Sequence, residues 1–112
     1  MTVITDNYMR EMLTKTKGYT LVLIKDGPTR DRPDADAIIW EHGRRNFGLR
    51  ADGVLAIVCP VSDATPLDGL YIFDAPADEV RRLMDDDPGV KVGLFVYEVH
   101  ETRGFPGDTL PA

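Results

Sequence analysis

Residues 54–73 read VLAIVCPVSDATPLDGLYIF and contain two runs of apolar and β-branched residues, VLAIVC and LDGLYIF. Runs of this length and composition are typical of β-strands, and Pro60 stops the first of them. The polar stretch between them, SDATP at residues 62–66, is rich in residues that form turns. The segment therefore predicts a hairpin, in which two strands follow each other with no helix between them.

A helix and a strand are predicted on each side of this hairpin. Upstream, the strand YTLVLIK at residues 19–25 precedes a helix over residues 34–51, which ends before Gly53. Downstream, a helix over residues 76–84 starts with a proline, and the strand VKVGLFVYEVH follows at residues 90–100. The order of elements is βαββαβ. We therefore predict an α+β fold of the ferredoxin-like, or split βαβ, type.

The length of 112 residues leaves room for one domain. We place that domain at residues 19–100, between an N-terminal extension of residues 1–18 and a C-terminal tail of residues 101–112. Apolar residues recur at helical spacing in the extension, which predicts a short amphipathic helix there. These residues are Tyr8, Met9, Met12 and Leu13.

Charge and cysteine content limit the partners and the compartment. Thirteen lysines and arginines stand against nineteen aspartates and glutamates, a formal net charge of −6, so we expect neither nucleic acid nor an anionic membrane as a partner. Cys59 is the single cysteine, which excludes an intramolecular disulfide and a cysteine-based zinc site. No signal peptide and no membrane-spanning stretch is recognisable. We expect a cytoplasmic protein.

The predicted strands are apolar on both faces. In the last strand Phe95, Tyr97 and Val99 alternate with a second apolar set, Val92, Leu94 and Val96. A sheet with one face in water alternates apolar with polar residues, and two helices can cover only one face. We therefore expect a second copy of the chain to cover the other face, so that the protein is a homodimer.

Two aromatic residues of the first long helix need separate cover. Trp40 and Phe47 are seven residues apart and project away from the face that points at the sheet. We expect the N-terminal helix or a partner subunit to cover them. The alternative is an ordinary, partly exposed pair of aromatic side chains.

His42 and Asp87 are the candidates for catalysis. His42 lies on the same helical face as Ile38 and Leu49 and points at the sheet. Asp87 is the last of three consecutive aspartates, and Pro88 holds it in an extended conformation. The βαββαβ topology can bring the two side chains together, and the carboxylate would then fix the imidazole tautomer and raise its basicity. A hydrogen-bonded histidine with a purely structural role is the alternative.

Three aromatic residues are candidates for binding a substrate, because they lie on apolar strands. They are Tyr71, Phe95 and Tyr97. Neither a glycine-rich phosphate loop nor a nucleophile elbow is present, and we expect no metal site and no cofactor.

The chain resembles the YCII-related family, also called YciI-like proteins, over roughly residues 19–100. An ordered set of segments carries the resemblance: YTLVLIK, HGRRNFGLRADGVLAIVCP and MDDDPGVKVGLFVYEVH. The resemblance implies a ferredoxin-like protomer assembled as a dimeric α+β barrel, similar in architecture to muconolactone isomerase. It also implies a His–Asp active-site pair, which falls on His42 and Asp87. The family commonly has a glycine before the proline at position 60, but this chain has Cys59. A side chain therefore stands where the backbone could otherwise approach a ligand.

The resemblance specifies a fold better than a reaction. Most of the family has no assigned activity, and one branch eliminates chloride from a chlorinated hydroquinone. We expect an enzyme of small-molecule metabolism that performs elimination or isomerisation on a cyclic or aromatic metabolite, by acid/base chemistry and without a cofactor. The alternative is a non-catalytic ligand-binding or interaction module, in which His42 and Asp87 only hold the helix to the loop.

Overall fold

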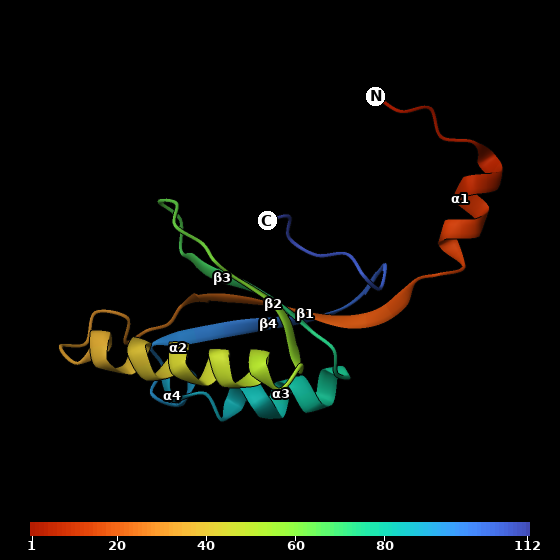
Figure 1. Ribbon diagram of the computed structural model, residues 1–112. Coiled ribbons are helices and arrows are strands. Elements are labelled where there is room, and N and C mark those ends of the chain that lie inside the picture. Colours follow the sequence, from red (N-terminus) through yellow and green to blue (C-terminus); the bar gives the residue numbers. More distant parts are fainter.

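One antiparallel sheet, covered on one side by helices, organises the chain (Figure 1). The computed structural model describes residues 1–112. Its elements are α1 (Asp6–Leu13), β1 (Lys17–Asp26), α2 (Ala35–Ala51), β2 (Leu55–Pro60), β3 (Leu67–Phe73), α3 (Ala77–Asp85), α4 (Pro88–Lys91) and β4 (Phe95–Gly104). The strand order is β2-β3-β1-β4, and every neighbouring pair is antiparallel. The predicted ferredoxin-like α+β fold is confirmed.

The start of the last strand differs from the prediction. Residues 90–94 were expected to be extended, but Pro88–Lys91 form the short helix α4, and β4 begins only at Phe95. The carboxylate of Asp87 starts this helix by accepting hydrogen bonds from the backbone N–H groups of Gly89 and Val90, at 2.9 and 3.1 Å. Gly93, with φ of 74°, then turns the chain into the strand. Helix capping here overrides the strand-like pattern of apolar residues.

The covered face of the sheet forms the core of the domain. Thr20, Val22 and Ile24 alternate along β1 and are buried against the helical layer. Tyr71 and Phe73 do the same along β3. The helices, the flanking strands and the bend before β4 complete this core with Leu55, Val80, Met84, Leu94 and Phe95.

The opposite face carries no helix, and we call it the open face. Leu21 and Leu23 of β1 lie opposite Ile72 and Leu70 of β3 on this face, and all four are only half-buried. Charged residues replace them along β4, where Glu98 pairs with Lys25 at 2.9 Å and with His100 at 3.6 Å. The open face therefore has an apolar centre and a charged margin.

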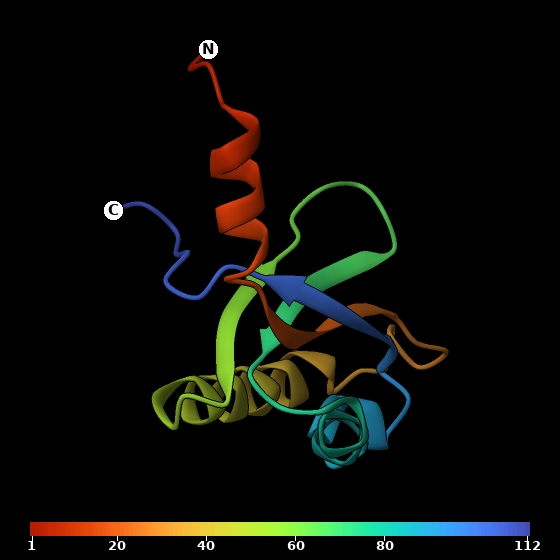
Figure 2. The same cartoon turned by 90° about the vertical axis from the view of Figure 1, so that its right-hand side faces the viewer.

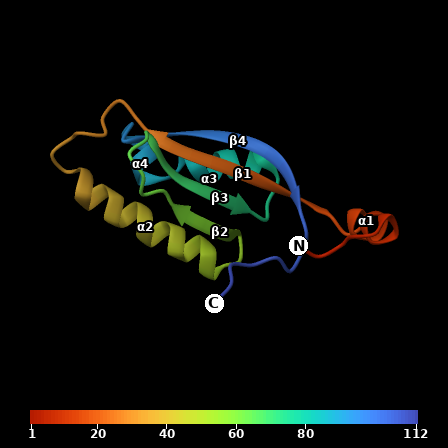
Figure 3. The ribbon, with the colours of Figure 1, turned by 90° about the horizontal axis from the view of Figure 1, so that it is seen from above.

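Helix α1 stands apart from the domain. It rises on the side of the open face, away from α2 and α3 (Figure 2), and lies beyond the N-terminal end of β1 when the sheet is viewed from above (Figure 3). The predicted helix exists, but none of its side chains is buried. The expectation that it covers Trp40 and Phe47 of its own chain is wrong, since these side chains are 70% and 68% exposed. No helix combines the length and the apolar character needed to cross a membrane.

Candidate functional site

Four buried polar side chains meet where α2 packs on the sheet. His42 and Asn46 lie one turn apart on α2, Tyr71 comes from β3, and Asp87 precedes α4. His42 is 8% exposed and Asp87 1%. Buried polar groups need hydrogen-bond partners, and these four residues supply them to one another.

The contact between His42 and Asp87 determines how the imidazole is protonated. Nδ1 of His42 lies 2.7 Å from Oδ1 of Asp87. The other carboxylate oxygen is already occupied by the backbone N–H groups of Gly89 and Val90. An ionised carboxylate only accepts hydrogen bonds, so Nδ1 carries a hydrogen and donates it. The neutral imidazole therefore has its free lone pair on Nε2.

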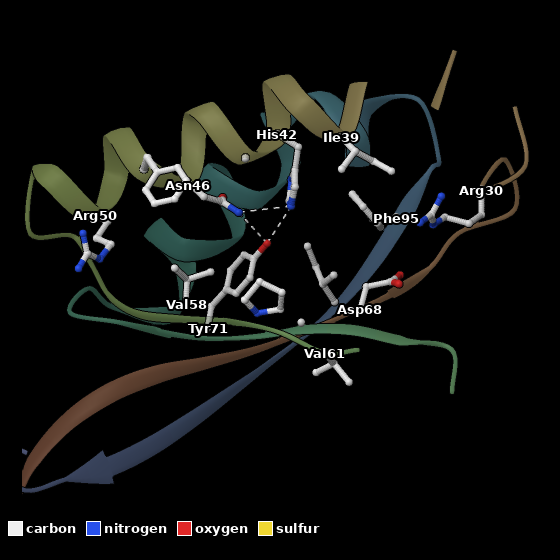
Figure 4. Close-up of a pocket in the computed structure, with 15 residues that line it drawn as sticks. Arg30, Ile39, His42, Asn46, Arg50, Val58, Val61, Asp68, Tyr71 and Phe95 are labelled. Carbon is white, nitrogen blue, oxygen red and sulfur yellow. Dashed lines mark hydrogen bonds between the residues drawn. The ribbon is translucent and has the colours of Figure 1, made fainter. Parts of the chain in front are cut away.

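Nε2 of His42 faces two groups that can donate to it. The hydroxyl oxygen of Tyr71 lies 3.0 Å away and the side-chain nitrogen of Asn46 3.3 Å away, while that nitrogen also lies 2.9 Å from the Tyr71 oxygen (Figure 4). Burial raises the pKa of Tyr71 above its ordinary value of 10, so the phenol keeps its proton. The bonds therefore run in one direction: Asn46 donates to Tyr71, Tyr71 to His42, and His42 to Asp87.

A cavity of about 590 Å³ opens beside this chain of hydrogen bonds. Its walls include Ile24, Ile39, Val58 and Phe95, and both His42 and Tyr71 reach its surface. The Phe95 ring lies against the imidazole, with ring centroids 4.8 Å apart. The volume and the mixed lining are those of a pocket for a small molecule.

The two ends of the cavity differ in charge (Figure 4). Arg50, in the last turn of α2, lies at one end. At the other end Arg30 lies over the Phe95 ring, with its guanidinium carbon 5.7 Å from the ring centroid, and Asp68 lies near it. Loss of hydration and the neighbouring carboxyl of Asp26 raise the pKa of Asp68 to about 6.

The model of the YCII-related domain matches residues 19–103. The chain belongs to the YCII-related domain family. The match spans nearly the whole sheet and includes His42, Tyr71 and Asp87, while α1 and the last residues of the chain lie outside it. No curated protein matches the chain. Membership confirms the resemblance and assigns no reaction.

The structure of this YCII-related protein brings most of the predicted site residues together. His42 and Asp87 are in contact, and Tyr71 and Phe95 line the cavity. Tyr97 lies outside the cavity. It is two residues after Phe95 on β4, and its side chain therefore packs beside α3 instead of α2, where its hydroxyl donates a hydrogen bond to Asp85.

Four polar residues of the cavity were not predicted. Asn46 and Arg50 follow His42 at intervals of four residues, so the helical period that placed His42 toward the sheet could have identified both. Asp68 stands out only as a charged residue in an otherwise apolar strand. Arg30 comes from the loop after β1, where no periodicity exists to orient it.

Proposed function

We propose that this YCII-related protein is an enzyme of small-molecule metabolism in which His42 acts as general base and then as general acid. One observation carries the proposal. The imidazole holds Asp87 through Nδ1 while its basic nitrogen, Nε2, faces a cavity large enough for a ring-sized metabolite. A structural histidine would need the contact with Asp87 but not the cavity.

The residues support a two-step transfer of one proton. Nε2 of His42 takes a proton from a carbon of the substrate, and the carboxylate of Asp87 stabilises the imidazolium that forms. Tyr71 turns its hydroxyl from Nε2 to an oxygen of the substrate, where it stabilises the negative charge that develops. The imidazolium then returns the proton at another carbon, an isomerisation, or gives it to a departing group, an elimination.

The size and lining of the cavity suggest the class of substrate. Apolar walls from Phe95, Ile39 and Val58 suit a cyclic or aromatic ring. The chemistry uses side chains alone and calls for no cofactor. We accordingly propose a cofactor-independent lyase or isomerase that acts on a small cyclic metabolite.

Hydrogen–deuterium exchange tests this proposal without knowledge of the natural substrate. The protein is incubated in D₂O with a panel of cyclic ketones, lactones and hydroxylated aromatic compounds, and NMR follows exchange at carbon. We expect exchange with at least one of them, a loss of about 10²–10⁴-fold in His42→Asn, and a smaller loss in Asp87→Asn. His100→Asn is the control, because His100 lies exposed on the open face.

Full exchange activity in His42→Asn would contradict the assignment of the base. Binding of ring compounds with no exchange in any of them would favour a non-catalytic binding module instead.

We also propose that the protein is a homodimer joined through the open face. The support is the half-buried apolar centre formed by Leu21, Leu23, Leu70 and Ile72, which no element of the chain's helical layer covers. Two sheets packed face to face would remove this surface from water in both copies.

A further inference from the structure

We propose that the two protomers of the dimer exchange their N-terminal helices, so that α1 of each protomer lies in a groove along α2 of the other, over Trp40 and Phe47. This inference rests on the homodimer proposed above and goes beyond it, since it names a second contact between the copies. It accounts for two features that the single chain leaves unexplained, an isolated amphipathic helix and a pair of exposed aromatic rings.

The groove is an apolar hollow of about 510 Å³ along α2. Ile39, Trp40 and Phe47 are its apolar residues, and Gly43 lies between the two aromatic residues in the sequence. No other side chain or element comes within 4 Å of the place that a Cβ would take at Gly43. Glycine weakens the middle of a helix but lets the backbone of a second helix approach closely. The groove therefore suits a helix.

Helix α1 has the length and the apolar side that the groove requires. Trp40 and Phe47 are seven residues apart, about 10 Å along α2, and the eight residues of α1 span about 12 Å. Apolar residues lie on one side of α1 and none of them is buried. These residues are Tyr8, Met9, Met12 and Leu13. A helix shorter than roughly 12 residues is marginal in water unless it packs on something, so α1 needs an apolar surface.

The base of α1 is fixed in a way that holds the helix away from its own α2. Nε and Nη2 of Arg103, on β4, donate hydrogen bonds to the side-chain and backbone oxygens of Thr16, both at 3.0 Å. Only residues 14–16 separate α1 from β1. The helix therefore rises on the side of the open face, while its own α2 lies on the other side of the sheet (Figure 2).

A second copy on the open face brings its α2 to the place where α1 stands. α1 lies beyond the N-terminal end of β1, whereas Trp40 lies near the start of α2, which follows the C-terminal end of β1 (Figure 3). A two-fold axis across the strands exchanges these two ends. Facing sheets pack about 10 Å apart, which is less than the length of α1. The helix therefore extends past the partner's sheet toward the partner's helical layer.

The exchanged helices add a large part of the area that a stable dimer needs. Trp40 and Phe47 are mostly exposed in the single chain, and a large aromatic side chain buries roughly 150–250 Å² when it is covered. With a similar area from α1, two exchanged helices bury on the order of 1,000 Å². Specific interfaces bury about 1,200–2,000 Å² in total, so the open face has to supply only the remainder.

The groove adjoins the cavity of the proposed function. Ile39, Gly43 and Phe47 border both of them. A helix in the groove therefore borders the cavity as well, and adds side chains of the second copy to its wall.

Mixed dimers test the exchange, because Trp40 is the only tryptophan. The reporter chain is Met12→Lys, which keeps Trp40 and carries a charge on the apolar side of α1. The second chain is Trp40→Phe, which has an intact α1 and no tryptophan. When the second chain is added in excess at micromolar concentration, we expect the emission of Trp40 to shift to shorter wavelength. A second chain that carries both Trp40→Phe and Met12→Lys should cause no shift.

Sedimentation of the single variants supplies a matched control. Asn7→Lys places the same charge on the polar side of α1, where Asn7 contacts only Arg10. We expect the dissociation constant of the dimer to rise at least about tenfold in Met12→Lys, since each dimer loses two packed contacts. Asn7→Lys should leave this constant unchanged.

Unchanged Trp40 emission in every mixture, or equal dissociation constants for Met12→Lys and Asn7→Lys, would overturn the exchange and leave the groove to another occupant. These outcomes are distinguishable from failure of the proposed dimer. A wild type that dimerises with no shift in emission keeps the open-face contact and loses the exchange, whereas a wild type that stays monomeric loses both.

Discussion

The two faces of the sheet are built from alternate residues of the same four strands, yet the polar side chains on them differ in their exposure to water. On the covered face Asp87, His42 and Tyr71 are buried and bonded to one another. On the open face Lys25, Glu98 and His100 form ion pairs in contact with water. Burial thus decides how much a polar contact contributes to stability. A buried group that loses its partner cannot form a hydrogen bond with water instead, whereas an exposed group can.

Removing Asp87 should produce the largest effect on stability. Asp87→Ala leaves the Nδ1–H of His42 and two backbone N–H groups without an acceptor in a dry site. We expect a loss of about 3–5 kcal/mol in the free energy of unfolding, measured with urea. Glu98→Ala, the counterpart on the open face, should change it little, because water solvates both of its partners. Equal losses in the two variants would remove the distinction between the faces.

A charge in the centre of the open face should break the proposed dimer without unfolding the protomer. We expect the wild type to sediment as a dimer at micromolar concentration and Leu21→Asp to sediment as a monomer. Each buried aspartate at such a position costs roughly 2 kcal/mol or more of association energy. Val22→Asp, one residue along on the covered face, should unfold the protein instead. A monomeric wild type with native near-UV circular dichroism would contradict the assignment of the interface.

The third test measures how stability depends on pH through Asp68, which lies on the covered side of the sheet. The pKa of Asp68 is raised from 3.8 to about 6, so the folded state binds this proton more tightly than the unfolded state. Stability from this group is therefore present below pH 4 and is lost as the pH rises toward 6. Asp26, Arg30 and His42 are the ionisable groups around it. Asp68→Asn should remove this part of the decline in melting temperature, and an identical pH profile in the variant would argue against a buried carboxyl.

Deleting residues 1–14 should have the smallest effect. Helix α1 buries none of its side chains, and Trp40 is already exposed to solvent within its own chain. We expect an unchanged urea midpoint and an unchanged Trp40 emission in dilute solution. A shift in emission that appears only at concentrations where the protein dimerises would mean that α1 of the partner covers Trp40.

The sequence predicted the topology and the central pair of the site because both depend on local patterns. The hairpin at residues 54–73 and the order of elements follow from apolar runs and turn residues, and the helical period of α2 places His42 toward the sheet. The βαββαβ connection then leaves the Asp87 turn beside that helix.

What could not be predicted depends on contacts between distant segments. Asp87 caps α4, which displaces the start of β4, and a pattern of apolar residues does not reveal a cap of this kind. One polar end of the cavity forms where the loop that carries Arg30 lies close to Asp68, 38 positions later in the sequence. The pairing of β1 with β3 is irregular at this point. The residue pattern of neither segment alone indicates that the two segments come into contact.

The position of β1 in the sheet has a consequence for biosynthesis. β1 is central and pairs with β3 and β4, both of which lie later in the chain. β4 ends at Gly104, so about 80 residues must be added after β1 before its second edge has a partner. At about 5–20 residues per second this takes roughly 4–16 s, during which YTLVLIK has at least one unpaired edge on the nascent chain. Chaperone contact with the nascent chain should therefore concentrate on residues 19–25 and end when β4 has been released.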